Sequence, residues 1–537
     1  MKKPKRLWAV DTEDNSKGKV YLINFCDENE KHHTFKKPKD AIEFLQNQSG
    51  SIDIWATNLG YDLSNIFQDY MSCLEITYIK GRVITAKIQG TGITFKDTLN
   101  HWKISVAEMG KRINLPKFKT ESFNNVKYCR RDTLITRRFV ASMEIKYAEI
   151  GAKLKSTIGS TALDIFKTRY HTHTFERSFK TSDIEWMLGG YYGGRTEIFH
   201  TKPIAGLIRY YDFNSLYPSV MVGRDFPIIG GHGFRLGNIE TTEGISEATV
   251  LVPRNIEIPY LPVRSKQGLI FPTGKFTGRW TNFELRECQK YGVRIEKIHK
   301  SFSFIGSYRP FDDFVRDLYE FRLKAQKDGD LLLSDSAKLI LNNLYGKFAQ
   351  GNEITRLLPY KKENLKNGDK VFRDLLLRDE KGEFPVHTNV VWSAYVTAYG
   401  RDKLYRGMLK TKANGGRLLY CDTDSIIFEG GDPLPTSNQL GDLKLEGTWN
   451  WAHFKLPKLY RLDGETRVTR AKGVPRLSAD EFFDQGFAQF KKPNKLRESL
   501  RRKLTPNEWV LTRKEIRRTY DKRHSTGSGT TKPIHLE

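Results

Sequence analysis

The sequence predicts a multidomain protein of mixed α/β and α+β class. At 537 residues, the chain is longer than one hydrophobic core normally supports. Residues 1–152 alternate strand-like runs such as RLWAVDTED and SIDIWATN with helical patterns such as DAIEFLQNQ, which is typical of an α/β domain. Residues 311–349 instead contain two consecutive helical patterns separated near Gly329, and a further helical pattern leads into the strand pair LLYCDTDSIIF at 418–428. These regions therefore predict separate domains.

The charge balance predicts a polyanionic partner. Lys and Arg number 89 against 63 Asp and Glu, which gives a formal net charge of +26. Such an excess favours nucleic acid, and the alternative is a soluble protein that is merely basic. The five cysteines stand singly, which fits neither a disulfide framework nor a structural zinc site. Neither a membrane-spanning run nor a signal peptide is evident, so we expect a cytoplasmic protein without membrane contact.

Four acidic residues in the N-terminal region have the spacing of a metal site. Two of them stand two apart on a strand and therefore project from one face. The acids and their polar neighbours are Asp11 and Glu13 in VDTED, Asn58, Tyr61 and Asp62 in TNLGYD, and Tyr128 and Asp132 in YCRRD. Clustered carboxylates repel one another unless cations join them, and hard ions such as Mg²⁺ or Mn²⁺ prefer oxygen ligands. A DxE motif on its own is more often a pair of surface acids without a catalytic role. The three motifs together indicate two-metal phosphodiester hydrolysis.

A second set of acids stands far apart in the sequence. They are Asp212 in DFNSLYPS, and Asp422 and Asp424 in YCDTDS. Between them, KLILNNLYG places Lys338, Asn342 and Tyr345 on one face of a helix. Acids for two metals, a cation for a triphosphate and an aromatic surface for a base pair are the parts of a nucleotidyl-transfer site. Taken alone, Lys338 reads as a solvated lysine and Tyr345 as a core aromatic.

The two sets resemble motifs of family B DNA polymerases. The first resembles the DxE, Nx2(F/Y)D and Yx3D motifs of proofreading 3′–5′ exonuclease domains, and the second resembles polymerase motifs A, B and C in the correct order. The resemblance implies an RNase H-like exonuclease domain plus a right-hand polymerase with palm, fingers and thumb. It also implies DNA-directed DNA polymerase and 3′–5′ exodeoxyribonuclease activities, with two Mg²⁺ or Mn²⁺ per active site and dNTP substrates.

The resemblance assigns a role to each matching residue. Asp212 and Asp424 would be catalytic metal ligands with the Phe213 carbonyl, Asp422 would support them, and Tyr128 would orient the water in the exonuclease site. Tyr217 would exclude a 2′-hydroxyl by shape. The other nucleotide contacts would be Lys338, Asn342, Tyr345, Arg322 and Lys324. The DNA contacts would be Tyr191, Gly193 and Gly194 of YYGG, Lys458 and Tyr460 of KLY, Thr98 and Leu99 of DTL, and Asn58 and Tyr61.

Length and motif spacing are similar to the protein-primed branch of family B from bacteriophages and linear plasmids. That branch carries two palm insertions, which serve terminal-protein binding, processivity and strand displacement. The expected divisions are exonuclease 1–152, linker and palm 153–222, first insertion 223–310, fingers 311–349, second insertion 350–388, palm 389–470, and thumb with tail 471–537. We expect KLRESLRRKL and RKEIRRTYDKRH near the end to be helical and STGSGTTKP to be disordered.

The predicted function is template-directed DNA synthesis with proofreading, on a linear viral or plasmid genome, by protein-primed initiation and strand displacement. The partners would be template-primer DNA, a terminal protein and a single-stranded DNA-binding protein, and the enzyme would be a monomer. One alternative is a family B polymerase that uses ordinary nucleic-acid primers. Another is a non-catalytic DNA-binding replication protein, which the retention of all the expected acids disfavours.

Overall fold

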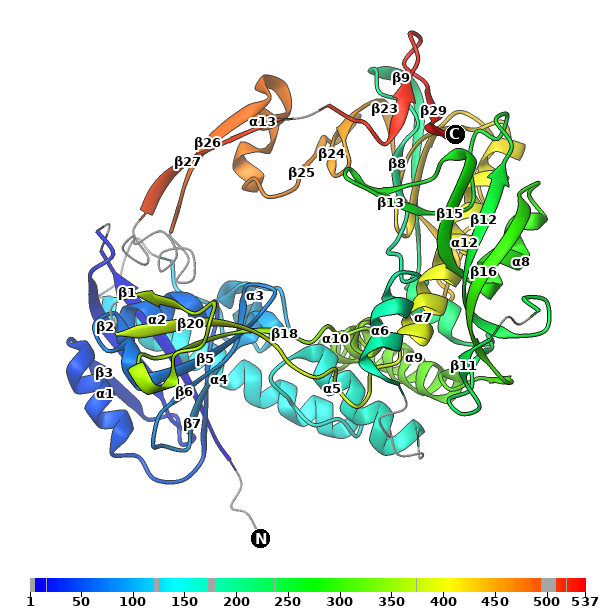
Figure 1. Cartoon of the computed structure of the whole chain (residues 1–537). Coiled ribbons are helices and arrows are strands. Elements are labelled where there is room, and N and C mark those ends of the chain that lie inside the picture. Colours follow the sequence, from blue (N-terminus) through cyan, green and yellow to red (C-terminus); the bar gives the residue numbers. More distant parts are fainter. Residues whose placement is uncertain are drawn as a thin grey trace.

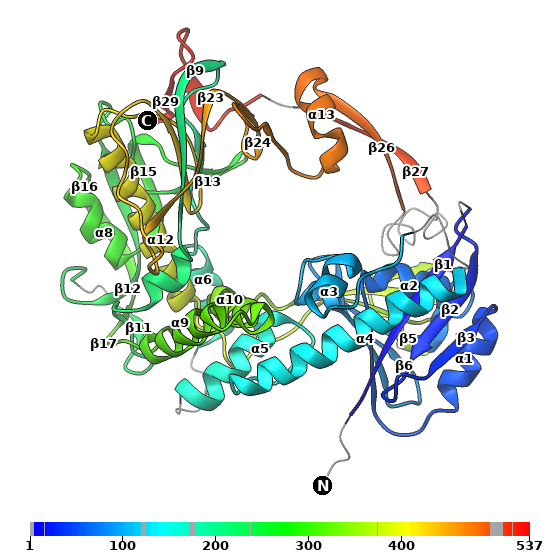
Figure 2. The same ribbon diagram turned by 180° about the vertical axis from the view of Figure 1, so that it is seen from behind.

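The computed structural model describes residues 5–15, 17–119, 125–171, 179–235, 238–372, 374–493, 509–517 and 519–537. The chain runs round an open ring (Figure 1). The N-terminal sheet and its helices form one side of the ring, and the palm sheet forms the opposite side. A helical region joins the two along one edge, and α13 (Ala479–Gln485), β26 (Phe487–Pro493) and β27 (Trp509–Glu515) extend from the palm toward the N-terminal region (Figure 2).

The N-terminal domain is built on a mixed sheet whose centre is parallel. Its strands are β1 (Arg6–Asp14), β2 (Val20–Cys26), β3 (His32–Phe35), β4 (Ile52–Ala56), β5 (Leu74–Ile79), β6 (Arg82–Ile88) and β7 (Ile93–Asp97). β4 pairs in parallel with β1 on one side and with β7 on the other. The helices are α1 (Pro38–Gln46), α2 (Leu59–Phe67), α3 (Val106–Arg112) and α4 (Asn125–Glu149). The predicted α/β organisation of this region is confirmed.

Three later strands extend this sheet. They are β18 (Glu353–Pro359), β19 (Lys370–Phe372) and β20 (Leu375–Lys381). β18 pairs antiparallel with β5, and Leu357 and Leu377 are buried in the same core as the strands of the N-terminal sheet. This segment falls within the predicted second palm insertion, 350–388, and its strands extend the N-terminal sheet because their apolar face completes that core.

The palm is a seven-stranded sheet in the order β25-β24-β23-β9-β22-β21-β8. The strands are β8 (Thr196–Ile198), β9 (Ile204–Phe213), β21 (Arg417–Asp422), β22 (Ser425–Glu429), β23 (Leu443–Leu456), β24 (Leu459–Asp463) and β25 (Val468–Ala471). The long helix α12 (Val390–Ala413) begins at Asn389, whose side chain caps it, and packs against β21 and β22. The strand pair β21–β22, formed by LLYCDTDSIIF, therefore lies between the central strand β9 and the edge strand β8 and is covered by α12.

A second sheet lies beside the palm within residues 223–310. Its order is β11-β16-β12-β15-β30, where β11 is Gly233–Phe234, β12 is Glu243–Val252, β15 is Thr273–Thr281, β16 is Arg294–Phe304 and β30 is His535–Leu536. Helix α8 (Asn282–Gln289) follows β15 and begins with a capping box between Thr281 and Glu284. The last strand of the sheet, β30, comes from the far end of the sequence and pairs in parallel with β15.

Helices connect the two sides of the ring. They include α5 (Ile158–Ile165), α6 (Thr181–Leu188), α7 (Leu216–Met221), α9 (Asp312–Lys327), α10 (Leu331–Asn343) and α11 (Tyr345–Phe348). The predicted helical pair at 311–349 is confirmed, and its break falls at Gly329, whose φ is 73°. Two ion pairs tie the pair to the N-terminal domain, Lys146 with Asp330 and Arg112 with Asp335.

The C-terminal region departs from the sequence prediction. RKEIRRTYDKRH is not a helix, because residues up to Glu515 form β27, which pairs with β26 along its whole length, and Arg523 begins β28 (Arg523–Ser525). Strand pairing has overridden the helix-forming composition. STGSGTTKP is ordered, since it forms the turn from β28 to β29 (Thr531–Pro533). KLRESLRRKL lies outside the described residues.

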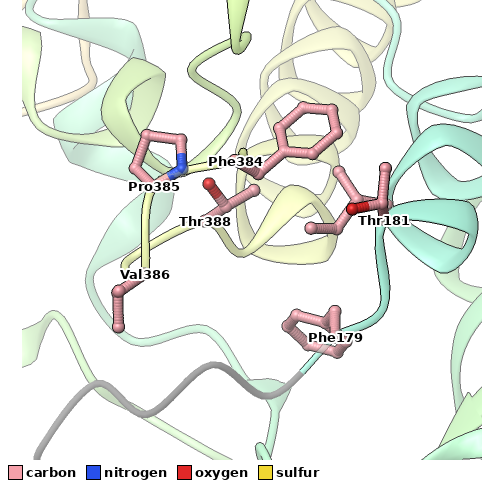
Figure 3. Close-up of a pocket in the computed structure, with 7 residues that line it drawn as sticks. Phe179, Thr181, Phe384, Pro385, Val386 and Thr388 are labelled. Carbon is pink, nitrogen blue, oxygen red and sulfur yellow. The ribbon is translucent and has the colours of Figure 1, made fainter. Parts of the chain in front are cut away.

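A pocket between α6 and the segment that follows β20 is too small for a substrate. Its lining residues are Phe179, Thr181, Ile184, Phe384, Pro385, Val386 and Thr388 (Figure 3). The volume of about 20 Å³ suits about one water molecule. Such a water could satisfy the Thr388 hydroxyl, which has no hydrogen-bond partner in the described protein. Among the described residues, no helix has the length and apolar character needed to cross a bilayer.

Candidate active sites

The structure brings the four N-terminal acids together from three elements. Asp11 and Glu13 lie on β1, Asp62 lies in the first turn of α2, and Asp132 lies on α4. Asp62 and Asp132 are almost completely buried, at 2% and 3% exposure. The Thr12 hydroxyl donates a hydrogen bond of 2.8 Å to Asp62 Oδ1, which fixes that carboxylate beside β1. The cluster is therefore built by the fold as well as by the local motifs.

Burial and mutual repulsion raise the pKa values of these carboxyl groups, so each is a weaker acid than usual. Burial first, and then the charges of Asp62 and Asp132, raise the pKa of Asp11 well above its usual value. Burial and the neighbouring Asp132 raise the pKa of Glu13 to about 7. The protein thus keeps several anionic groups close together at a cost that bound cations would relieve.

The donor set of this cluster fits a hard divalent cation. Ligand atoms of Asp11, Glu13 and Cys129 lie within 4.8 Å of one another, and the buried Asp132 Oδ1 has no hydrogen-bond partner in the described protein. Burial raises the pKa of the Cys129 thiol, and its Sγ donates to the backbone oxygen of Asp11. A protonated thiol is a poor ligand for Mg²⁺, so the carboxylates would hold the ion.

Lys117 joins this site without having been anticipated from the sequence. Its ammonium group forms an ion pair with Asp132 and lies 4.6 Å from the ring centroid of Tyr128. The hydrogen bond to Asp132 helps to raise the pKa of Lys117, although burial opposes it. Lys117 therefore stays charged and fixes Tyr128 and Asp132 relative to each other. A lone lysine 15 residues before Asp132 carries no sequence signal, because the contact depends on how the intervening segment folds.

The residues expected to contact a single strand differ in accessibility. Asn58 is exposed and adopts a left-handed conformation (φ 67°) at the start of α2. Tyr61 is half-buried and hydrogen bonds to Asp14. Leu99 is half-buried, but Thr98 is fully buried and its hydroxyl donates to Thr57 Oγ1 at 3.1 Å. The Thr98 side chain is thus not available to a strand in this structure and instead secures the loop before α2.

The palm brings Asp212 and Asp424 together at the centre of its sheet. Asp212 pairs with Ser425 in the register of β9 and β22, and the Phe213 amide donates to the Asp424 backbone oxygen at 2.8 Å. Burial and then the Asp424 charge raise the pKa of Asp212 to about 7, and burial also raises the pKa of Asp424. Neither side chain has an ion-pair partner in the part of the chain described. Two neighbouring carboxylates without a cationic partner fit hard divalent cations, which prefer oxygen ligands.

Asp422 differs from Asp424 because the protein already neutralises it. Lys458 Nζ lies 3.0 Å from Asp422 Oδ2, and the hydroxyls of Thr196 and Tyr420 donate to the same carboxylate at 2.9 and 3.2 Å. Strand alternation alone would place the two acids on one face. Thr423, however, has φ 64°, and the turn after β21 breaks the alternation. The expected division into a principal and a supporting acid agrees with these contacts.

Gly194 is required where YYGG passes the tip of this hairpin. A Cβ built on Gly194 would lie 2.7 Å from the Thr423 side chain, and the Thr423 amide donates to the Arg195 backbone oxygen at 2.7 Å. Gly193 has open space instead.

A Gly194→Ala substitution is expected to reduce primer extension strongly, because its methyl group would displace the turn that carries Asp424. Displacement of a reacting group by about 1 Å can cost about 100-fold in rate. The measurement is the single-turnover extension rate, with Gly233→Ala as the control, because an added methyl group also meets open space there and Gly233 lies outside the YYGG loop. Equal rates for the two variants would contradict this reading of the contact.

Three tyrosines converge beside the palm acids. The rings of Tyr217 and Tyr345 have centroids 4.5 Å apart, and a hydrogen bond joins their side chains. Tyr191 lies close enough that its charge would raise the pKa of both. A Cβ on Gly400 of α12 would lie 3.1 Å from the Tyr217 ring, which limits its movement. The tyrosines predicted to contact the base pair and the sugar are thus neighbours in the structure.

Only some of the predicted phosphate contacts face this site. Lys338 is exposed on α10, and its charge lowers the pKa of Asp212, so it lies within electrostatic range. Asn342 is half-buried one turn later and donates to the Lys338 backbone oxygen. Arg322 on α9 reaches Ser215 Oγ at 3.4 Å, beside motif A. Lys324 is exposed on α9, and because it is two residues from Arg322 it points to a different side of the helix.

The KLY segment supports the same hairpin from the other side. Lys458 lies in the turn between β23 and β24 with φ 63°, and its amide donates to the Tyr420 hydroxyl at 3.0 Å. Tyr460 is buried and hydrogen bonds to Tyr210 on β9. Glu446 on β23 is a further acid near Asp212, and its charge also raises the pKa of that group. Sequence reasoning did not include Glu446, since an isolated acid on a polar strand face is common.

Without divalent cations, the protein is expected to lose stability as the pH rises. The pKa of Glu13 rises from 4.5 to about 7 and that of Asp212 from 3.8 to about 7. Between the unfolded and the folded pKa values, the folded state holds protons that the unfolded chain has already released. The free energy of unfolding therefore falls as the pH rises through this range, and the loss is complete above about pH 7. The rise in thermal midpoint caused by Mg²⁺ over EDTA should be larger at about pH 8 than at about pH 5. An equal rise at both would argue against cation-binding acid clusters.

The two acid sites and their sheets define a right-hand polymerase joined to an RNase H-like domain, and solved structures agree with this architecture. The phi29 DNA polymerase complexed with primer-template DNA and incoming nucleotides superposes with a TM-score of 0.77 at 19% identity, covering 96% of this chain and all of that one. Its post-translocation binary complex gives a TM-score of 0.76 at 18% identity. This similarity establishes the fold.

A sequence profile for DNA polymerase type B, organellar and viral, matches residues 119–399, and the chain belongs to that family. The DNA-directed DNA polymerase of Enterobacteria phage PRD1 is 29% identical over 430 residues, covering 76% of this chain and 73% of that enzyme. The DNA polymerase of Bacillus phage phi29 is 28% identical over 338 residues, or 57% of this chain and 54% of that one. A probable DNA polymerase of Podospora anserina matches 60% of this chain but only 31% of its own length. The predicted relationship to this branch of family B is confirmed.

Proposed function

We propose that this DNA polymerase proofreads with its N-terminal domain and initiates on a protein primer, replicating a linear viral or plasmid genome with strand displacement. The observation that carries the synthetic activity is that Asp212 and Asp424, on neighbouring strands, lie close enough to repel each other, beside the tyrosines Tyr217 and Tyr345. In a phage-infected cell this activity would take place in the host cytoplasm.

At the palm, Asp212, Asp424 and the Phe213 carbonyl would hold two Mg²⁺ or Mn²⁺ ions. Such ions, when bound, lower the pKa of a primer hydroxyl and neutralise the triphosphate and pyrophosphate. Lys338 would pair with the incoming phosphates, and Arg322 would add charge from α9. Asn342 and Tyr345 would line the nascent base pair, and Tyr217 would pack against the sugar and exclude a 2′-hydroxyl. Lys458, which neutralises Asp422, would also hold the primer terminus.

At the N-terminal site, Asp11, Glu13, Asp62 and Asp132 would hold two cations that support hydrolysis of a phosphodiester. Tyr128 would orient the attacking water, and Lys117 would keep Tyr128 in place through its contacts with the ring and with Asp132. Asn58, Tyr61 and Leu99 would contact the frayed 3′ strand. The YYGG loop with Tyr191 would guide DNA between the two sites, because backbone without side chains can approach phosphates closely.

The proposed partners follow from charge and from the two insertions. The net charge of +26 fits a template-primer duplex. Residues 223–310 form a separate sheet beside the palm and would receive a terminal protein, whereas residues 353–381 extend the exonuclease sheet and would act in processivity and strand displacement. A single-stranded DNA-binding protein would cover the displaced strand.

Two assays test these proposals with the full chain. Labelled primer annealed to a template should be extended in Mg²⁺ with four dNTPs, and a 3′ single strand should be degraded without them. Transfer of labelled dAMP to the terminal protein of the same replicon would establish protein priming. Extension of DNA primers without any protein adduct would instead support a family B polymerase that uses ordinary primers.

A further inference from the structure

Residues 519–537, called here the return segment, leave the thumb and come back to the palm. Figure 1 shows β29 and the end of the chain beside β9 and β23 rather than beside α13 and β27, and Figure 2 shows the same from behind. The segment ends as β30 in the sheet of residues 223–310. We expected this stretch to be a thumb extension and a disordered tail, and neither function proposed above uses it.

The return segment contacts the outer edge of β8, which is the last strand of the palm sheet. An edge strand presents unpaired backbone groups on its free side. Here the Ile198 amide donates to the Tyr520 hydroxyl at 2.9 Å, and Lys522 Nζ donates to the Thr196 oxygen at 3.3 Å. The Thr531 hydroxyl donates to the Ile198 oxygen at 2.9 Å. Side chains of the return segment thus take the place of a further strand.

A buried charge network anchors the segment at the same point. Arg523 Nη1 lies 3.6 Å from Glu197 Oε1, and Arg195 Nη2 lies 2.5 Å from Glu197 Oε2, with all three side chains at most 3% exposed. Arg523 also donates to the backbone oxygen of Glu257 and to Thr531 Oγ1, both at 2.8 Å. Removing one member of such a network leaves buried charge uncompensated.

The other side of β8 holds the hairpin that carries the catalytic acids. Asp422 pairs with Thr196 in the register of β21 and β8, and Cys421 pairs with Glu197. The Thr196 hydroxyl donates to Asp422, and the Arg195 oxygen accepts from Thr423. Because β8 has only three residues, its position depends on what packs against both edges. The return segment and the hairpin are therefore coupled through one short strand.

We infer that the return segment is a positioning element of the polymerase site, and that Arg523 sets the placement of the Asp422–Asp424 hairpin through Glu197 and β8. The inference rests on the proposed polymerase mechanism for its effect on rate, but the coupling itself concerns only this chain. Arg523 touches neither DNA nor nucleotide in this assignment. Its contribution is to order a turn that must hold Asp424 opposite Asp212.

The test combines hydrogen exchange with the two activities in an Arg523→Gln variant of the full chain. Amides of residues 417–429 should exchange faster than in the wild type without any metal, while those of residues 6–14 should be unchanged. The single-turnover extension rate should fall about 10- to 100-fold, as when an outer partner of a metal ligand is lost, and degradation of a 3′ single strand should be retained. An Arg523→Lys variant should recover part of both signals.

Matched variants decide between positioning and general stability. Lys532→Ala removes an exposed charge from the same segment and should match the wild type. Tyr520→Phe removes only the hydroxyl that accepts from Ile198, so it tests the coupling even if Arg523→Gln fails to fold. Unchanged hairpin exchange and extension in Tyr520→Phe and in folded Arg523→Gln would overturn the inference, as would an equal loss of both activities. Failure of the wild type to extend primers would instead refute the proposed function, while the exchange result would still report on the coupling.

Discussion

Replacement of Asp424 by asparagine is expected to abolish primer extension and to leave degradation of a 3′ single strand intact. Asp424 has no ion-pair partner in the described chain, and its charge raises the pKa of Asp212. The two carboxylates therefore repel each other, and bound cations would offset that repulsion. Asp424→Asn keeps the size of the side chain but removes half of that anionic pair. The loss should exceed the roughly 10- to 100-fold that removal of an outer partner costs.

Asp422 provides the matched control for this prediction. Asp422→Asn keeps the size of the side chain but has a single acceptor oxygen, so it loses the ion pair with Lys458 and keeps only one of the hydrogen bonds from Thr196 and Tyr420. Its extension rate should fall by a smaller factor than that of Asp424→Asn. The measurements are single-turnover extension at saturating dNTP and exonuclease rates on the same preparations. If Asp422→Asn were the more damaging change, the assignment of the principal acid would be reversed.

The parts of the sites that lie within local motifs could be predicted from the sequence. Asp11 and Glu13 are on one strand, and Asp132 follows Tyr128 by one helical turn, so spacing alone indicates their common face. Asp212 and Asp424 are far apart, but each sits where an apolar strand meets a polar turn, which an ionised group would not occupy without a role. The chemistry of clustered acids is thus visible before the fold is known.

The parts that depend on long-range pairing could not be predicted. β18 joins β5 across more than 270 residues, and nothing in its alternation distinguishes a palm insertion from an added strand of another sheet. In the sequence, Arg523 is one of several charged residues in a basic run. Only the fold shows that it lies opposite Glu197. Lys117 is similar, since a solvated lysine and one that holds Asp132 have the same local sequence. In each case a partner remote in sequence decides between two ordinary interpretations.

A double Asp11→Asn, Glu13→Gln variant is expected to lose degradation of a 3′ single strand while extending primers at nearly the wild-type rate. The four acids lie in the N-terminal sheet and α4, whereas Asp212 and Asp424 lie in the palm sheet, and helices connect the two. Removing two ligands should leave too few donors for two cations, so hydrolysis should fall by more than the 10- to 100-fold typical of an outer partner. Exonuclease and extension rates on labelled DNA measure both effects.

The same double variant should also change thermal stability, and the direction of that change distinguishes loss of catalysis from loss of folding. Burial and mutual repulsion raise the pKa of Asp11 and of Glu13, so the wild-type cluster opposes folding when no cation is present. Neutral amides remove that repulsion, and the thermal midpoint in EDTA should therefore rise above the wild type, while the midpoint in Mg²⁺ should rise less or fall. Asp69→Asn, an exposed acid after α2, should change neither activity nor midpoint. A variant that lost both exonuclease activity and stability in EDTA would show that Asp11 and Glu13 maintain the domain rather than hold cations. Acids that bind cations should stabilise the protein when the cations are bound and destabilise it when they are absent.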